Sequence, residues 1–571
     1  MLASLLIWIY IIVFSYLYGA TILEMLQKFF DIQPDEQISS KPLIALFGLC
    51  CITVLACLLS LFIKLGWLAQ TIFLIGGIIL GLRLRRTQAR SFQIKLNSIS
   101  WLLILLSLLI LLTTLENGSH SPINPDTGIY HAQAIRWIET YPAVPGLGNL
   151  HSRLAYDSSW LVINAFFSFS FLGLRSFHVV PGAFLILVLI YLVGGTDRLL
   201  KGNITITDIL KTLLIPLIFY TFVSEISSPG TDFPADVFIW VILALWLESI
   251  EINPTDGNKP IKVDELLIFT FTIFLITVKL SIIAVILLPL FIVVNQARKR
   301  AVNALKLMAV ALIILGPWLA RNLILSGYWV YPVPFLANLS PNWDWKIPLP
   351  NVTQEARMIQ AWARIPNLNR DIVLAMPLQK WLKEWSERLT EIQKLFVLGA
   401  VFSPLVFGLA WLTGLHKKIF KGYFAYIYLV SCIGLIFWLY EAPDIRFGYG
   451  FIISSILLAI TPCLVWLLHK MPYQKNLVFG MVILLILFQA RILYKTNSIS
   501  TLASRIILPA DYNSSLATAP CSIHGYTLFC AEYYNECDYS PFPCIPPGDT
   551  RKNIELRGDS LEDGFRYIEK P

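Results

Sequence analysis

Apolar residues in this chain are grouped in long blocks of helical length rather than in alternation. Segments 43–63 and 99–115, for example, contain no charged residue. A helix needs about 20 apolar residues to cross a bilayer, whereas the strands of a membrane barrel alternate apolar and polar residues. Only 14% of the residues are charged, against about 25% in soluble domains. The sequence therefore predicts an all-α integral membrane protein and excludes a soluble enzyme, a disordered chain and a nucleic-acid binder.

The apolar blocks predict about 14 transmembrane helices. We expect these helices at residues 2–19, 43–63, 67–82, 99–115, 179–193, 209–223, 237–247, 266–277, 281–294, 307–323, 396–412, 424–439, 451–468 and 477–488. Residues 158–172 are also apolar, but this stretch is short and carries Ser and Asn. We expect it to form a helix at the outer interface rather than a span.

Lysine and arginine set the expected orientation, because cytoplasmic loops of membrane proteins carry an excess of both. The basic loops of this chain lie at 82–95, 196–203, 296–306, 415–422 and 468–475. With these loops in the cytoplasm, alternation places the other long segments on the outer side, at 116–174, 227–236, 326–394, 441–448 and after Arg491. The net charge of +8 sits mostly in the basic loops, so it does not indicate an anionic partner.

This pattern divides the chain into five parts. We expect N-terminal transmembrane helices at 1–97, a membrane core at 98–325 with the first outer loop at 116–174, an outer loop at 326–395, C-terminal transmembrane helices at 396–490 and a small outer tail at 491–571.

The tail contains four of the nine cysteines, at Cys521, Cys530, Cys537 and Cys544, separated by polar and Pro-rich sequence. Clustered cysteines in a small polar region indicate disulfides and an oxidising compartment, although free thiols are the alternative. Four cysteines allow three pairings, of which Cys521–Cys530 with Cys537–Cys544 is one.

The first outer loop contains Asp126, followed by an amphipathic stretch in which Ile129, Ala132, Ile135 and Ile138 recur at helical spacing. Two interpretations of Asp126 are open. It is either an N-cap that accepts hydrogen bonds from the first N–H groups of this helix, or a catalytic carboxylate held at the membrane surface. Further candidate substrate-binding residues surround it in sequence, namely Tyr130, His131, His151 and Arg153.

Other ionisable residues interrupt or close the apolar blocks on the outer side. Asp232 lies in the second outer loop, and Lys279 stands alone in an apolar run, where a charge costs about 2.5–3.5 kcal/mol on insertion scales. Arg321 and Arg446 end two further spans on the outer side. The three cations suit a lipid phosphate, which arginine can hold through two parallel hydrogen bonds. A nearby carboxylate could then act as general base on an acceptor hydroxyl.

These pieces resemble a known group of enzymes. The segments PDTGIYHAQAIRW, VPGLGNLHSRLAYDSSW, SSPGTDFPAD, VKLS, PWLARNLILSGYWVYP, APDIRFG and NECDYSPFPCIP make the chain similar to the GT-C superfamily of polytopic glycosyltransferases, and closest to a bacterial family of polytopic membrane proteins within it. The resemblance implies catalytic carboxylates at Asp126 and Asp232, and phosphate contacts from Lys279, Arg321 and Arg446. The first-loop motif is a lone Asp-Thr-Gly rather than an acidic pair. We therefore name no metal ligand and leave a divalent metal open as a cofactor.

The resemblance implies an inverting glycosyltransferase that moves a sugar from a polyprenyl-phosphate donor to a cell-surface glycan or lipid acceptor. The expected location is the bacterial inner (plasma) membrane, with the active site facing the periplasm or exterior. An O-antigen-type polymerase or ligase is the alternative enzyme, and it need not use Asp126. A transporter or flippase of a lipid-linked glycan is the alternative from another class, and it predicts repeated halves and charges near the midplane of the bilayer.

Overall fold

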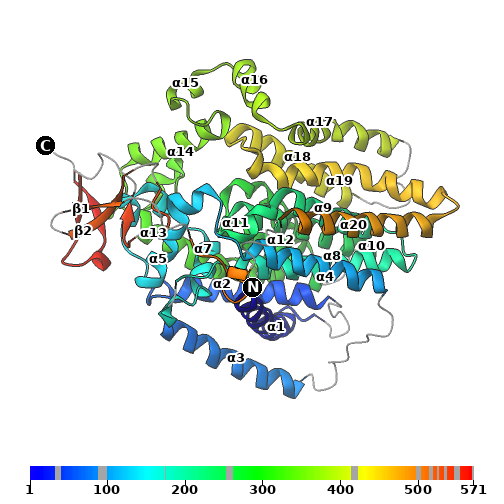
Figure 1. Cartoon of the computed structure of the whole chain (residues 1–571), viewed down its shortest axis with the longest axis horizontal. Coiled ribbons are helices and arrows are strands. Elements are labelled where there is room, and N and C mark those ends of the chain that lie inside the picture. The colour runs from blue at the N-terminus through cyan, green and yellow to red at the C-terminus, as the bar shows by residue number, and fades with distance from the viewer. Residues whose placement is uncertain are drawn as a thin grey trace.

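The computed structural model describes the chain apart from residues 33–39, 88–99, 174, 253–260, 413–421, 497–502, 513–517, 524–525, 533–535, 540, 546–552 and 569–571. The predicted basic loops at 82–95 and 415–422 lie mostly outside the described residues. The rest forms an array of long helices with the strands of the tail at one end, which we call the tail end (Figure 1).

Thirteen helices are long and apolar enough to cross a membrane, so the described chain is built as a helical membrane protein. They are α1 (Leu2–Phe29), α2 (Lys41–Leu59), α3 (Trp67–Thr87), α4 (Trp101–Gly118), α8 (Val180–Leu200), α9 (Ile206–Phe222), α10 (Asp232–Ile252), the joined helices η5 (Leu280–Ile286) and α12 (Leu287–Lys299), α13 (Ala301–Ser326), α17 (Glu391–Leu412), α18 (Tyr423–Glu441), α19 (Ile445–Lys470) and α20 (Gln474–Thr496).

The predicted span at 266–277 differs from these thirteen. It is helix α11 (Val263–Val278), which has only 16 residues, and every residue from Leu266 to Val278 is buried. The backbone becomes extended at Lys279 and then continues as the 3-10 helix η5. The pair of spans expected around Lys279 is therefore one short helix enclosed by protein, followed by a longer helix of mixed geometry.

Helix α7 (Ser159–Phe166) corrects the prediction of an interfacial helix at 158–172. All eight residues of α7 are buried, and the helix packs against α2, α5 and α11. A helix lying at a membrane interface would keep one polar face in water. The stretch is apolar because protein surrounds it. Its short length agrees with the prediction that it does not span.

Helices α1 and α2 pack closely because small residues meet at their crossing. A Cβ atom added to Gly19 would lie 2.0 Å from the carbonyl oxygen of Ile44, and one added to Gly48 would lie 1.7 Å from that of Ser15. No side chain fits at such separations. Small residues bring membrane helices together in this way, since van der Waals contact drives their association.

Shorter helices fill the connections between the long ones. They are η1 (Thr127–His131), α5 (Ala132–Thr140), α6 (Leu147–Leu150), η2 (Ser152–Ala155), η3 (Ser170–Leu172), η4 (Val223–Ser227), η6 (Pro334–Leu339), α14 (Leu349–Arg364), α15 (Arg370–Ala375), α16 (Leu378–Arg388) and, in the tail, η8 (Leu561–Asp563).

The tail adds β-structure to a chain predicted to be all-α. Strands β1 (Thr518–Ile523) and β2 (Tyr526–Ala531) are antiparallel, and β3 (Cys544–Ile545) runs parallel to β2. Strands β4 (Ile554–Leu556) and β5 (Phe565–Tyr567) form a second antiparallel pair. Disulfides join Cys521 to Cys530 and Cys537 to Cys544, which is one of the three pairings that the sequence leaves open.

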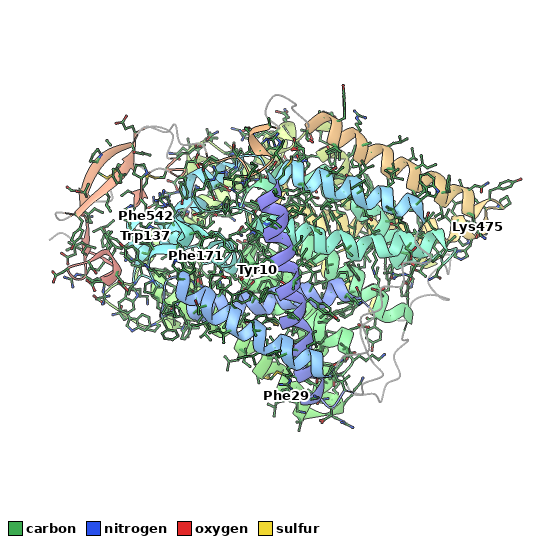
Figure 2. The ribbon with its side chains drawn as sticks, turned by 60° about the horizontal axis from the view of Figure 1, so that its bottom comes forward. Tyr10, Phe29, Trp137, Phe171, Lys475 and Phe542 are labelled. Atoms are coloured by element: carbon green, nitrogen blue, oxygen red, sulfur yellow. A yellow bond between two sulfur atoms is a disulfide. The ribbon has the colours of Figure 1, made fainter. Side chains whose placement is uncertain are left out.

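The tail is docked onto the first loop. The N–H of Phe565 donates to the carbonyl of Pro145 at 2.9 Å, and the rings of Trp137 and Phe542 meet with their centroids 5.0 Å apart (Figure 2). Strands β1 and β2 lie at the tail end of the array (Figure 1). Because the two segments are in contact, they lie on the same side of any membrane that the helices cross.

Candidate functional site

The site is built on the turn that follows α4. The side chain of Asn124 accepts the N–H of Asp126 at 2.8 Å, and Pro125 is the first helical residue. Proline suits that position because its φ is already helical and no N–H is needed there. Residues Thr127–His131 then form a π-helix in which the N–H of Ala132 bonds the carbonyl of Thr127. Single π-turns are rare and occur frequently at functional sites.

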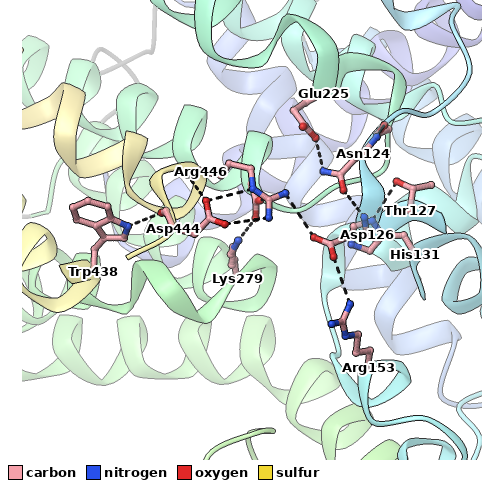
Figure 3. A network of polar contacts seen from close by, with 12 residues as sticks. Asn124, Asp126, Thr127, His131, Arg153, Glu225, Lys279, Trp438, Asp444 and Arg446 are labelled. Carbon is pink, nitrogen blue, oxygen red and sulfur yellow. Dashed lines mark hydrogen bonds and ion pairs between the residues drawn. The ribbon is translucent and has the colours of Figure 1, made fainter. Parts of the chain in front are cut away.

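Asp126 is not the cap of this turn, because its side chain makes no capping hydrogen bond. The N-cap interpretation of Asp126 is therefore wrong, and Asn124 takes that role. The Asp126 carboxylate instead faces two arginines, with Oδ1 3.6 Å from Nη1 of Arg153 and Oδ2 3.8 Å from Nη1 of Arg446 (Figure 3). Its side chain is 30% exposed. It is thus held between cations and is open to a ligand.

Arg446 is the centre of the charged cluster. It lies in the first turn of α19, where the side chain of Asp444 accepts its backbone N–H at 3.0 Å and so caps the helix. Its guanidinium faces three carboxylates, with Nη2 3.3 Å from Asp444 and Nη1 3.8 Å from both Asp126 and Asp232. Only the Asp444 contact lies within hydrogen-bonding distance. The guanidinium is therefore surrounded by loose ion pairs rather than by a closed set of hydrogen bonds.

Lys279 joins the cluster from the break between α11 and η5. Its ammonium group donates to Asp232, in the first turn of α10, and lies 3.7 Å from the ring centroid of Phe447. The side chains of Lys279 and Asp232 are 15% and 9% exposed. Asp232 contacts both Lys279 and Arg446, so this carboxylate holds two cations beside the more open Asp126.

A second layer of polar contacts fixes the turn from behind. The Asn124 side chain donates to Glu225 at 2.6 Å, while the hydroxyl of Ser228 accepts the N–H groups of Ile123 and Asn124, each at 3.1 Å. Both partners follow α9 in the chain. The turn is thus tied to η4 and the loop after it.

The two predicted histidines lie near Asp126 in sequence but bring no charge to the site. Burial lowers the pKa of His131 to about 4 and that of His151 to about 3, so both rings are neutral at pH 7. His131 Nδ1 lies 3.4 Å from the Thr127 hydroxyl, and its buried Nε2 has no hydrogen-bond partner within the described part of the chain. The structure brings His131 into the turn, whereas it places His151 between α6 and η2.

The aromatic ring of Tyr130 lies close to Asp126. The Arg153 guanidinium lies 5.9 Å from the centroid of its ring, and the ring of Tyr156 meets it edge-on at 5.6 Å. Burial, together with the charge of Asp126, raises the pKa of Tyr130. The phenol is therefore a neutral hydrogen-bonding group beside Asp126.

Arg321 does not join the cluster. Its Nε lies 3.0 Å from Oδ1 of Asp157, its Nη1 donates to Ser60 at 2.7 Å, and its side chain is 3% exposed. A small cavity beside the pair is lined by Trp137 and Tyr156. Arg321 is thus held in a separate buried ion pair, whereas Asp126, Arg153, Asp232, Lys279 and Arg446 come together.

Sequence reasoning assigned no role to Asn124, Asp157 or Phe447. A signal was present for Asn124, because Asn-Pro-Asp ahead of an amphipathic stretch is typical of an asparagine cap followed by proline. No local pattern pairs Asp157 with Arg321, since the partners are 164 positions apart.

Metal binding has little support from the donor set. Among the described residues, no group of three or more His, Cys, Asp or Glu side chains is placed to hold a metal ion. The carboxylates of the cluster are each opposed by a cation instead.

Comparison with known protein families matches residues 1–453 to the family described as "Domain of unknown function (DUF8201)". The match covers more than half of the chain, so the chain belongs to this family. No curated protein and no solved structure matches the chain.

Proposed function

We propose that this member of the DUF8201 family is a membrane glycosyltransferase that moves a sugar from a polyprenyl-phosphate donor to a cell-surface glycan or lipid acceptor. The observation that carries the proposal is the charged cluster at the tail end of the helices. It combines a half-open carboxylate, Asp126, with the cations Arg446 and Lys279 at the ends of membrane helices. This is the chemistry that a lipid-linked phosphate and an acceptor hydroxyl need.

The proposed topology has 14 crossings with the tail end outside. The N–H groups of Leu2 and Ala3 donate to the carbonyls of Ile506 and Ile507, so the beginning of α1 and the segment after α20 lie on one side. An even number of crossings must separate them, and the short helix α11 adds the fourteenth to the thirteen long helices. The basic loops lie at the opposite ends of these helices, which favours an outer position for the site.

In the proposed reaction, Arg446, Lys279 and Arg153 hold the phosphate of the donor. A phosphate oxygen would replace the distant carboxylates of Asp126 and Asp232 around the guanidinium of Arg446. As the bond between the anomeric carbon and the phosphate oxygen breaks, the electron pair stays on the lipid phosphate. The cations stabilise the charge that develops there. Asp232 keeps Lys279 in place.

Asp126 is the proposed general base. It accepts the proton of the acceptor hydroxyl while that oxygen forms the new bond to the anomeric carbon, whose transition state has oxocarbenium character. Tyr130 and the neutral ring of His131 supply hydrogen bonds beside it rather than charge. Arg321 has no part in the proposed chemistry, because it is held in a separate buried ion pair with Asp157.

The test compares Asp126→Asn with the parent and with the control Asp371→Asn, whose carboxylate is exposed on α15. The substrates are undecaprenyl-phosphate hexoses presented with a cell-envelope glycan extract, and the product measured is free undecaprenyl phosphate. A general base contributes roughly 10²–10⁴-fold in rate, so Asp126→Asn is expected to lose turnover on that scale while Asp371→Asn retains it.

Near-parental turnover of a folded Asp126→Asn variant would reject Asp126 as the base. It would favour the polymerase or ligase alternative, which can use the same cations without this carboxylate. Movement of undecaprenyl-phosphate hexoses across the bilayer of vesicles, without release of undecaprenyl phosphate, would instead support a flippase and overturn the proposal.

A further inference from the structure

The segment of the tail around Cys537 lies directly on the π-helix that follows Asp126. The N–H groups of Cys537 and Asp538 both donate to the carbonyl oxygen of Gly128, at 2.9 and 2.7 Å. A carbonyl oxygen has two acceptor lone pairs, and the tail uses both. The carbonyl of Gly128 therefore points out of the helix toward the tail.

Gln133 makes the second attachment, one turn further on. Its side-chain amide donates to the carbonyl of Asp538 at 3.1 Å and accepts the N–H of Cys544 at 3.0 Å. Gln133 is 1% exposed, and Cys537 and Cys544 are equally covered. Both the NH2 group and the oxygen of this buried amide are hydrogen-bonded. Movement of the tail away from Gln133 is therefore costly, because loss of either bond leaves a polar group unpaired away from water.

The Cys537–Cys544 disulfide completes this attachment. It joins the residue that bonds Gly128 to the residue that bonds Gln133, so one covalent bond keeps both contacts in register. The other disulfide, Cys521–Cys530, joins β1 to β2, and within the described part of the chain neither of its cysteines makes a hydrogen bond to η1 or Gln133. The two disulfides of the tail thus form a matched pair for comparison.

Gly128 also lies against the side chain of Glu536, the residue before Cys537. A Cβ atom added to Gly128 would lie 3.4 Å from the Glu536 carboxylate, which is an ordinary van der Waals contact with a side chain of the tail.

We propose that Gln133 and the Cys537–Cys544 disulfide are positioning elements that hold the π-helix η1, and with it Asp126, in place against the tail. Gly128 is two residues from Asp126, so release of the tail frees the turn whose first residues carry the carboxylate. The effect on sugar transfer rests on the proposed function, whereas the effect on the turn itself does not.

The test measures amide hydrogen exchange of the full chain in lipid nanodiscs, in peptides covering residues 124–135. Two variants remove the attachment: Cys537→Ala with Cys544→Ala, and Gln133→Met, which keeps the size of the side chain without its hydrogen bonds. The control is Cys521→Ala with Cys530→Ala. We expect exchange over Thr127–Gln133 to rise at least about tenfold in both test variants, as expected for losing roughly 1.4 kcal/mol or more of protection, and to stay at the parental rate in the control.

Parental exchange over Thr127–Gln133 in Gln133→Met would overturn the proposal, as would an equal rise in the control. Gln133→Met keeps both disulfides, so the question is answered even if the cysteine variants fail to fold. Faster exchange in the test variants, combined with an inactive parent protein, would support the positioning role while rejecting the proposed transfer reaction.

Discussion

Arg446 and Arg321 both lie near the tail end of a long helix, yet their surroundings differ. Arg446 is 31% exposed, and two of its three carboxylate partners lie beyond hydrogen-bonding distance at 3.8 Å. Arg321 is 3% exposed and has Asp157 at 3.0 Å and Ser60 at 2.7 Å. The donors of Arg321 are already used inside the protein, whereas those of Arg446 are partly free.

The difference separates a structural charge from one available to a ligand. A buried arginine with a close carboxylate joins two parts of the fold, and replacing its partner leaves a charge without compensation. A half-exposed arginine among distant carboxylates contributes little to stability, since exposed ion pairs are worth about 0–1 kcal/mol. Sequence position alone does not distinguish them, because both close an apolar block.

Removing the Asp157 carboxylate is expected to have the largest effect on stability. Asp157→Ala leaves Arg321 buried and unpaired, which should lower the free energy of unfolding by about 3–5 kcal/mol. Asp126→Ala is the matched variant in the open cluster, and its exposed ion pairs predict a loss of at most about 1 kcal/mol. Unfolding in detergent, followed by tryptophan fluorescence, measures both. Equal losses of unfolding free energy in the two variants would show that the Arg321 ion pair and the charged cluster around Arg446 do not differ in their contribution to stability.

The next effect concerns the geometry of Arg446. Arg446→Lys keeps the charge but loses the planar fork, so affinity for undecaprenyl phosphate in nanodiscs should fall roughly tenfold, the scale of one charge-assisted hydrogen bond. Arg300→Lys, on an exposed loop, serves as the control and should leave affinity unchanged. Unaltered binding by both variants would show that Arg446 acts only as a point charge or not at all.

Substitution of Asn124 tests whether the charged cluster depends on the hydrogen bonds that hold the turn before Asp126. Asn124→Ala removes the cap of the turn, which costs about 1 kcal/mol and should appear as a lower melting temperature. Asn124→Asp keeps a capping oxygen but sets a second carboxylate against Glu225, so its melting temperature should also fall below that of the parent at pH 7. If the side chain of Asn124 contributes nothing to stability, both variants will keep the parental melting temperature.

The smallest effect is a pH dependence at the interface between α5 and the tail. Glu139 is partly buried, its carboxylate accepts the hydroxyl of Ser176, and desolvation raises its pKa from 4.5 to about 7. The unfolded chain therefore loses this proton first, and stability falls as pH rises from about 4.5 to about 7. Glu139→Gln should melt with the parent at pH 4.5 and at a higher temperature than the parent at pH 8. A constant difference in melting temperature across this range would contradict the assignment.

Sequence reasoning captured the features that depend on neighbouring residues. The long apolar helices follow from local hydropathy. Lys279 stands out because it interrupts an apolar block, Arg446 because it closes one, and Asp126 because it precedes an amphipathic stretch in the first outer loop. It missed what depends on distant partners. Arg321 was grouped with the phosphate ligands because nothing near it in sequence reveals Asp157. An interfacial position is predicted for residues 158–172 because the stretch is short and carries Ser and Asn, but burial by protein and burial by lipid select the same apolar residues.

The short length of α11 also determines how this protein can be assembled. Its 16 residues rise about 24 Å, less than the roughly 30 Å hydrocarbon thickness, and its neighbours are α2, α10, α12 and α13. Lipid alone would match this segment poorly during synthesis, and Lys279 at its end would add to the mismatch. The groove that encloses it is finished only once α12 and α13 have been made. Stable insertion of this helix is therefore expected to wait for α12 and α13, and the charged cluster is complete only after α19, which carries Arg446, has been added.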